Sequence, residues 1–192
     1  MNKQHTTPER AAELFLAGVR ACPEILHAGC PDIRRPTTHL IGASDRANAI
    51  FEELKGALLR YRDVTGFGRG LAAPQIGIRE RAFVTYLGDE WKLFLNPSIV
   101  GAGSSSAESL YRESCLSCGP ISVDVRRRAR ITATWTTASG KIEIEELAGA
   151  EARIFQHELD HLDGVLCVDI AEPGSINLRT EDPLAEMFRP VP

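Results

Sequence analysis

An HExxH motif, His157-Glu158-Leu159-Asp160-His161, constrains this chain more than any other stretch of its sequence. If the segment is helical, His157 and His161 lie one turn apart on the same face and can bind one metal ion. Glu158 then lies beside them, close enough to exchange protons with a water at that ion. The alternative is an exposed helix that carries two solvated histidines.

The residues around this motif predict a helix from about Gly149 to Leu162 that stops at Gly164, because glycine commonly follows a helix C-terminus. Two earlier helices are expected. One begins at Thr6-Thr7-Pro8-Glu9 and ends before Pro23, and the other begins at Ser44-Asp45. The second has an apolar face that should pack on a core, formed by Ile50, Leu54, Ala57, Leu58 and Tyr61.

Strand patterns fill the middle of the chain, while residues 101–107 form a polar loop. The predicted strand regions are residues 82–87 and 91–95, joined by a turn at Gly88-Asp89, then 122–136, 141–145 and 165–170. We therefore predict a single-domain α+β fold, with antiparallel or mixed β-sheets packed around the late helix that carries HExxH.

Composition narrows the possible partners and compartment. The net charge of −4 over 192 residues argues against nucleic acid or an anionic membrane, and the arginine-rich stretch at residues 126–130 reads as a solvated strand face. No apolar run reaches the roughly 18 residues of a transmembrane helix, and the first residues do not resemble a secretory signal. Five scattered cysteines, an odd number, indicate reduced thiols in the cytoplasm.

Two histidines leave a metal site incomplete, since a catalytic metal usually has three protein ligands and one open position. No third histidine follows His161 at the metzincin spacing. A carboxylate from Glu172 or Glu181 is one option, and a thiolate from the C-x-x-C pair of Cys115 and Cys118 is another. That pair can also be read as a redox pair, although the glycine and proline that follow disfavour the helix such pairs usually precede.

Three separated segments resemble the motifs of peptide deformylase, the metallohydrolase that removes formyl groups from nascent chains. They are Gly68-x-Gly70-Leu71-Ala72-Ala73-Pro74-Gln75, then Glu113-x-Cys115-Leu116-Ser117, and Gln156-His157-Glu158-Leu159-Asp160-His161-Leu162-Asp163-Gly164. Pro31-Asp32-Ile33-Arg34-Arg35-Pro36 resembles an early family segment less closely. The resemblance implies a metallohydrolase domain over residues 29–170, a helical extension at 1–28 and an irregular or strand-like tail at 171–192.

The resemblance also implies the roles of particular residues. Cys115, His157 and His161 would hold one divalent metal, iron(II) in the cell, with zinc, nickel or cobalt as substitutes. Glu158 would take a proton from the attacking water and pass it to the leaving amine. The Gln75 side chain and the Leu116 backbone N–H would stabilise the oxyanion.

Five residues are expected along the substrate by the same resemblance: Gly68, Arg69, Gly70, Glu113 and Ser114. Glu113, with either Arg126 or Arg127, would also brace the metal site from behind. Arg69 stands where the family usually has an aliphatic residue, Ser114 where it has glycine, and Cys118 where it has an apolar residue. These departures leave the metal chemistry intact and bear on specificity.

The implied function is removal of the formyl group from N-formyl-methionyl peptides, with transient association with the ribosome and no nucleic-acid or membrane partner. The alternative is a diverged deformylase that acts on another N-formyl or N-acyl compound in a specialised pathway. A zinc endopeptidase that shares only HExxH is disfavoured by the Cys115 motif. A non-catalytic metal-binding relative is disfavoured by the intact Glu158 and Gln75.

Overall fold

The computed structural model describes residues 7–42, 44–101 and 107–178 of the chain. Its α-helices are α1 (Pro8–Ala21), α2 (Ser44–Thr65) and α3 (Gly149–Leu162). All three begin where the sequence predicts. The Thr7 side chain caps α1 by accepting the Arg10 N–H at 3.3 Å, as expected for a threonine just before a proline in the first turn.

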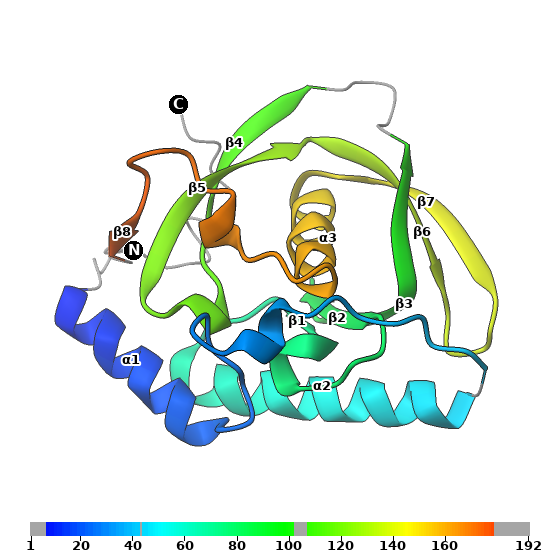
Figure 1. The fold of residues 1–192 in the computed structure, drawn as a ribbon, viewed down its shortest axis with the longest axis horizontal. Helices are drawn as coiled ribbons and strands as arrows, with labels where there is room; N and C mark the ends of the chain where they lie inside the picture. The colour runs from blue at the N-terminus through cyan, green and yellow to red at the C-terminus, as the bar shows by residue number, and fades with distance from the viewer. Residues whose placement is uncertain (1–6, 43, 102–106, 179–192) are drawn as a thin grey trace.

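The strands form two antiparallel sheets (Figure 1). One sheet has the order β1-β2-β3-β6-β7, with strands Gly70–Ala72, Ala82–Leu87, Glu90–Gly101, Arg130–Thr136 and Ile142–Ala148. The other has the order β4-β5-β8, with strands Glu108–Glu113, Ile121–Arg128 and Asn177–Leu178. Helix α3 lies between these strands, which confirms the predicted α+β fold around the HExxH helix.

The five-stranded sheet is covered by a helix on each face near β1 and β2. Side chains of a strand point alternately to opposite faces. In β2, Ala82 and Val84 pack in the cluster that contains α2, whereas Phe83 packs in the cluster that contains α3. Strand β2 is therefore buried on both sides, and the sheet separates α2 from the HExxH helix.

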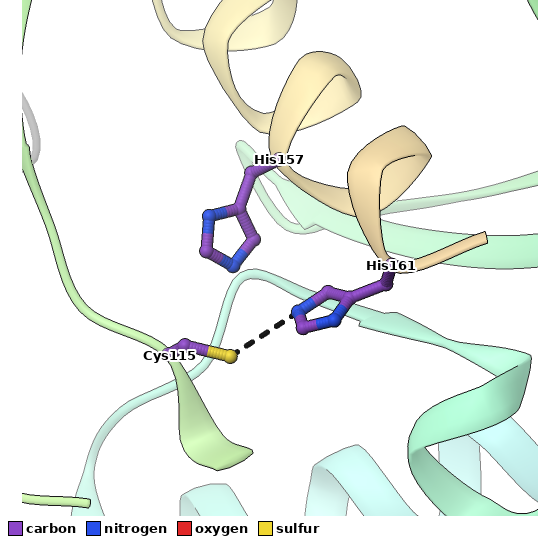
Figure 2. Close-up of side chains that lie close together, drawn as sticks. All are labelled: Cys115, His157 and His161. Carbon is purple, nitrogen blue, oxygen red and sulfur yellow. Dashed lines mark hydrogen bonds between the residues drawn. The ribbon is translucent and has the colours of Figure 1, made fainter. Parts of the chain in front are cut away.

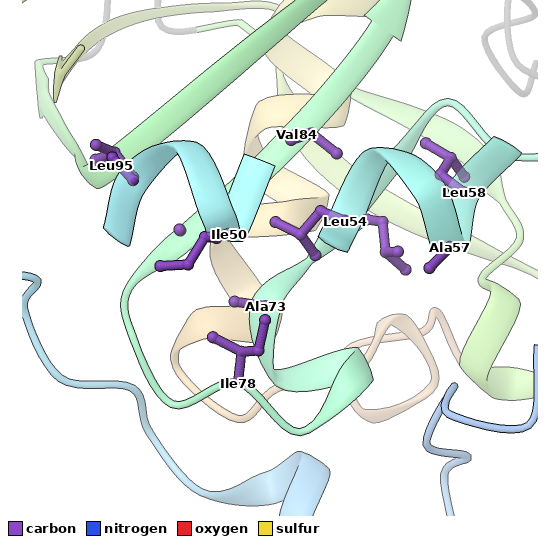
Figure 3. Packing of buried hydrophobic residues seen from close by; sticks show 11 residues of the cluster. Ile50, Leu54, Ala57, Leu58, Ala73, Ile78, Val84 and Leu95 are labelled. Atoms are coloured by element: carbon purple, nitrogen blue, oxygen red, sulfur yellow. The ribbon is translucent and has the colours of Figure 1, made fainter. Parts of the chain in front are cut away.

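Helix α2 contributes the predicted apolar face to the core beneath the sheet (Figure 3). Ile50, Leu54 and Leu58 are fully buried there and recur at helical spacing. They pack against Val84 of β2 and Leu95 of β3. This layer supports β1 and the loop before it from below.

One face of helix α3 packs on the sheet and the opposite face carries the motif histidines. Ala152, Phe155 and Leu162 pack against the five-stranded sheet, with the Phe155 ring centroid 5.2 Å from that of Phe83 and at a near-perpendicular angle. The histidines of the motif are on the other side, toward the loop that follows β4. The apolar face thus fixes the helix so that the motif faces the second sheet.

The strand expected at residues 165–170 is wrong. This segment contains a short 3₁₀ turn, Cys167–Asp169. The Asp169 carboxylate accepts the Leu166 N–H at 2.7 Å, and the Asp169 N–H donates to the Leu166 carbonyl at 2.9 Å. This local side-chain bond offers the backbone an alternative to a strand ladder.

The remaining sequence expectations have mixed outcomes. Strand β3 runs further than predicted, and most of the expected loop at 101–107 lies outside the described residues. In the arginine-rich stretch Arg126, Arg128 and Arg130 are exposed, but Arg127 is buried. The boundaries expected at residues 28 and 171 stay predictions. No helix within the described ranges is both long and apolar enough to cross a membrane.

Candidate active site

The two histidines of the motif and one cysteine converge in the interior (Figure 2). His157 and His161 project from α3 with ring centroids 5.1 Å apart, as residues one helical turn apart should. Cys115 approaches from the end of β4, and its Sγ lies 3.2 Å from His161 Nε2. One potential ligand atom from each of the three residues lies within 4.8 Å of the others.

The other candidates for a third donor that lie within the described ranges do not join this cluster. Glu172 is ion-paired with Arg126, at 2.6 Å between Oε1 and Nε. Glu181 lies outside the described residues. Cys118 lies in the 3₁₀ turn Leu116–Cys118 and packs beside Cys115 and Cys167 in a small apolar cluster. All five cysteines are free thiols.

The donor set fits one divalent metal ion. A thiolate with two imidazoles suits borderline-soft ions such as zinc or iron(II) and leaves a fourth position open. The Nδ1 of His157 is bound to Glu113 Oε2 at 2.9 Å, so its Nε2 is the nitrogen left for a metal. A second sign of a polar occupant is Glu158 Oε2, which is buried and meets no hydrogen-bond partner among the described residues.

A buried ion network holds His157 in place from behind. Arg127 binds Glu113 through two parallel hydrogen bonds of 2.9 Å, and it also binds Asp160 at 2.6 Å. Burial alone would raise the pKa of Glu113, but Arg127 and His157 hold it well below its usual range. Arg127 is thus the arginine of the expected pair that contacts Glu113. Asp160, which the sequence reasoning gave no role, is the fourth residue of the motif and lies on the same helix.

Glu158 lies in a dry environment against the backbone of β1. Only 4% of its surface is exposed, and burial raises the pKa of its carboxyl to about 7. Gly70 is the close neighbour, since a Cβ at that position would come within 2.3 Å of Glu158 Oε1. A carboxyl group with a pKa near neutrality can both accept and return a proton.

Gln75 is held with its amide nitrogen toward Cys115. Its Oε1 accepts the Ala72 N–H at 2.7 Å, and its Nε2 donates to Ser117 Oγ at 3.0 Å. The same Nε2 lies 3.7 Å from Cys115 Sγ. The motif reasoning did not anticipate Ser117 as a partner, although the motif itself contains that serine. The fixed orientation points an N–H group at the metal-binding cluster.

A pocket opens beside the cluster. All the residues expected along the substrate line it, namely Gly68, Arg69, Gly70, Glu113 and Ser114, as do Gln75, Cys115, Leu116, His157 and Glu158. Arg112 and Arg153 also line it and were not anticipated. The available signal was spacing, because Arg153 is four residues before His157 and therefore shares its helix face.

Comparisons with known proteins identify relatives along most of the chain. The family model for polypeptide deformylase matches residues 22–175. A peptide deformylase of Thermotoga sp. (strain RQ2) is 34% identical over 146 residues, which cover 76% of this chain and 85% of that relative. A peptide deformylase of Thermotoga neapolitana is 42% identical over 107 residues, and this chain covers 64% of its length, slightly under two thirds.

The fold is similar to solved structures as well. The crystal structure of a peptide deformylase from Thermotoga maritima matches with a TM-score of 0.70 and 34% sequence identity. The match covers 78% of this chain and 97% of that one. These matches confirm the resemblance drawn from the three sequence motifs: the chain belongs to the polypeptide deformylase family, a family of formyl-removing hydrolases.

Proposed function

We propose that this protein is a metal-dependent hydrolase that removes the formyl group from N-formyl-methionyl peptides. The observation that carries the proposal is the convergence of Cys115, His157 and His161 beside the buried carboxyl of Glu158, with Cys115, His157 and Glu158 lining one pocket. Water adds to the formyl carbon and the C–N bond breaks. Formate and a free amine are the products.

Cys115, His157 and His161 are the proposed ligands, with iron(II) as the proposed ion in the cell and zinc, nickel or cobalt as ions that suit the same donors. When bound, the ion supplies a Lewis acid that polarises a carbonyl and lowers the pKa of water toward neutrality. Glu113 orients His157 by accepting its Nδ1–H, and Arg127 fixes Glu113 in turn. Anaerobic metal analysis of the protein from its own cells tests the identity of the ion.

Glu158 is the proposed proton carrier. Its carboxylate takes a proton from the attacking water and then donates it to the amine nitrogen as the C–N bond breaks. Support comes from its burial and from its raised pKa of about 7, because such a group serves as base and acid near neutral pH. The contact with Gly70 holds the carboxyl against β1.

Gln75 and Leu116 are the proposed donors to the oxyanion that forms at the formyl oxygen. The Gln75 amide is already oriented by Ala72 and Ser117, so little reorganisation is needed when charge develops. Leu116 follows Cys115 directly, and both line the pocket. Removal of one such donor typically lowers kcat by about 10²–10³-fold.

The peptide is proposed to lie along β1. This strand is at the edge of the five-stranded sheet, so its outer side can pair with an extended peptide. Gly68 and Gly70 border the pocket at the start of this strand. A nascent chain as substrate further implies transient contact with the ribosome in the cytoplasm, which co-sedimentation with translating ribosomes tests.

The proposed activity is tested by release of formate from formyl-Met-Ala-Ser by zinc- or iron-loaded protein. We expect turnover by the wild type and a loss of about 10²–10⁴-fold in Glu158→Gln, with metal content unchanged, because the amide cannot accept the proton. Glu145→Gln, an exposed glutamate on β7, is the matched control. Near-normal turnover by Glu158→Gln would exclude Glu158 as the proton carrier.

A second candidate function is hydrolysis of a different N-formyl compound by the same machinery. The specific observation in its favour is the charge of the pocket, which is lined by Arg69, Arg112 and Arg153. The methionine side chain is apolar and its thioether forms no ion pair with a guanidinium. The arginines therefore favour a formylated residue other than methionine.

A further inference from the structure

The pocket beside the metal-binding cluster carries more positive than negative side chains. Its lining includes three arginines, Arg69, Arg112 and Arg153, against two carboxyl groups, Glu113 and Glu158. The negative charge of Glu113 is already balanced by Arg127, which donates two hydrogen bonds to its carboxylate.

Arg153 brings a buried guanidinium close to the reacting centre. It is four residues before His157 on α3, on the same face and about 6 Å along the helix axis. Only 3% of its surface is exposed, and burial lowers the pKa of its guanidinium. The guanidinium carbon lies over the Tyr111 ring at 5.6 Å from its centroid, which holds the side chain at the pocket wall.

Arg69 approaches the same pocket from the loop before β1. It stands between Gly68 and Gly70, next to the residue that touches Glu158. Its Nε atom is buried and meets no hydrogen-bond acceptor in the described part of the chain. A buried donor without an acceptor is costly, and a bound acceptor would remove that cost.

Arg112 has a different role in this lining. Asp124 binds it through two hydrogen bonds of 2.8 and 3.1 Å, so its charge is balanced by a neighbouring strand. The inference rests on Arg69, whose buried Nε meets no acceptor among the described residues, and on the buried guanidinium of Arg153 in the same lining. Arg69 comes from the loop before β1 and Arg153 from α3, and both line this pocket.

We propose that Arg69 and Arg153 bind an anionic group of the substrate, a carboxylate or phosphoryl group on the residue whose nitrogen carries the formyl group. This inference rests on the proposed deformylase chemistry and specifies the second candidate function, in which the formylated residue is acidic and is not methionine. A guanidinium presents paired N–H donors that match carboxylate and phosphate oxygens, and such charge-assisted bonds are about twice as strong as neutral ones. Because the Arg153 side chain is buried, water screens its charge less and such bonds are strengthened further.

The first experiment compares kcat/KM for three peptides on metal-loaded protein: formyl-Glu-Ala-Ser, formyl-Gln-Ala-Ser and formyl-Met-Ala-Ser. Glutamate and glutamine have nearly the same shape, so their ratio isolates the charge. We expect formyl-Glu to exceed both others by about tenfold or more. A fourth peptide, with formyl-phosphoserine at the first position, distinguishes a phosphoryl group from a carboxylate. If its kcat/KM exceeds that of formyl-Glu-Ala-Ser, the pocket binds a phosphoryl group; otherwise it binds a carboxylate.

Three variants complete the kinetic test. Arg69→Met and Arg153→Met should lower the Glu-to-Gln ratio toward one, mainly through KM, while Arg130→Met should leave it unchanged. Arg130 is an exposed arginine on β6 that is paired with Glu146 and is not among the residues lining the pocket. If Arg153→Met does not fold, Arg69→Met carries the test, since Arg69 is only half-buried in a loop.

A binding measurement separates this inference from the proposed function. Calorimetry with the product peptides Glu-Ala-Ser and Gln-Ala-Ser needs no turnover. If no formyl peptide is hydrolysed, the deformylase proposal fails, while tighter binding of Glu-Ala-Ser, lost in Arg69→Met, still supports the anion pocket. If formyl-Met or formyl-Gln is hydrolysed as well as formyl-Glu and the variants change nothing, the anion pocket is wrong and the deformylase proposal stands.

Discussion

The backbone of Gly70 touches the carboxyl group of Glu158, so closely that a Cβ on residue 70 would lie 2.3 Å from Oε1 and 2.7 Å from the carboxyl carbon. Gly70 belongs to β1 and Glu158 to α3. These two elements pack together on the face of the five-stranded sheet that α3 covers. The glycine is therefore required by the position of the proposed proton carrier.

Gly70→Ala should displace the Glu158 carboxyl group while leaving the metal donors in place. A shift of about 1 Å at a reacting group can cost on the order of 10²-fold in rate, and we expect a loss of that size in kcat. Formate release and metal content are the measurements. Gly29→Ala is the control, because a Cβ there has no atom within 4 Å. Normal kcat in Gly70→Ala would show that the contact does not position Glu158.

Glu113→Gln should weaken both metal binding and folding. The substitution removes the charged acceptor of the His157 Nδ1–H, and loss of such a partner typically lowers metal affinity by about 10–100-fold. It also leaves the buried Arg127 charge without its main counter-ion, which costs about 3–5 kcal/mol in the free energy of unfolding. Chelator competition measures the first effect and urea denaturation the second.

Glu146→Gln is the matched control for this prediction. It breaks the ion pair with Arg130, at 3.0 Å but half exposed to solvent, and such surface pairs contribute only about 0–1 kcal/mol. Equal effects of the two substitutions on stability would contradict the assignment of Glu113 to a buried network.

Cys115→Ala should remove most of the bound metal, because two imidazoles remain of the three donors. The protein is expected to bind close to one equivalent of metal and the variant far less, measured by elemental analysis after dialysis. Cys30→Ala, a cysteine outside the donor cluster, should retain the full amount. Full occupancy in Cys115→Ala would refute the ligand assignment.

Leu54→Ala should destabilise the layer between α2 and the five-stranded sheet. Leu54 is fully buried among the apolar side chains shown in Figure 3, and truncation of a buried leucine costs about 2–5 kcal/mol. Urea denaturation measures the change. Ile142→Ala on β7, where 68% of the residue's surface is exposed, should change stability by no more than about 0.5 kcal/mol.

Local structure was determined largely by the sequence itself. The helix predicted from about Gly149 to Leu162 coincides with α3, and the apolar face that includes Ile50 and Leu54 is the buried face of α2. Both predictions depend on periodicity and on residues at helix ends, which act within one or two turns. The motif resemblance added the family, because three separated motifs in one order rarely coincide by chance.

Local patterns failed where a side chain redirected the backbone. Residues 165–170 have the apolar character of a strand, yet the Asp169 carboxylate closes a turn on the Leu166 N–H. Periodicity does not report such a bond. The sequence pattern and the hydrogen bond compete for the same backbone group, and the hydrogen bond prevails.

Tertiary structure decided which distant side chains meet. The residues alone left Glu172, Glu181 and a cysteine open as the third donor, and only the packing of α3 against the loop after β4 brings Cys115 to His161, 46 residues away in the chain. The same packing places Arg69 and Arg153 in one pocket, although the sequence indicated only Arg69. Helix and strand preferences act over a few residues, whereas a site is assembled by the burial of apolar faces that no local pattern orients relative to one another.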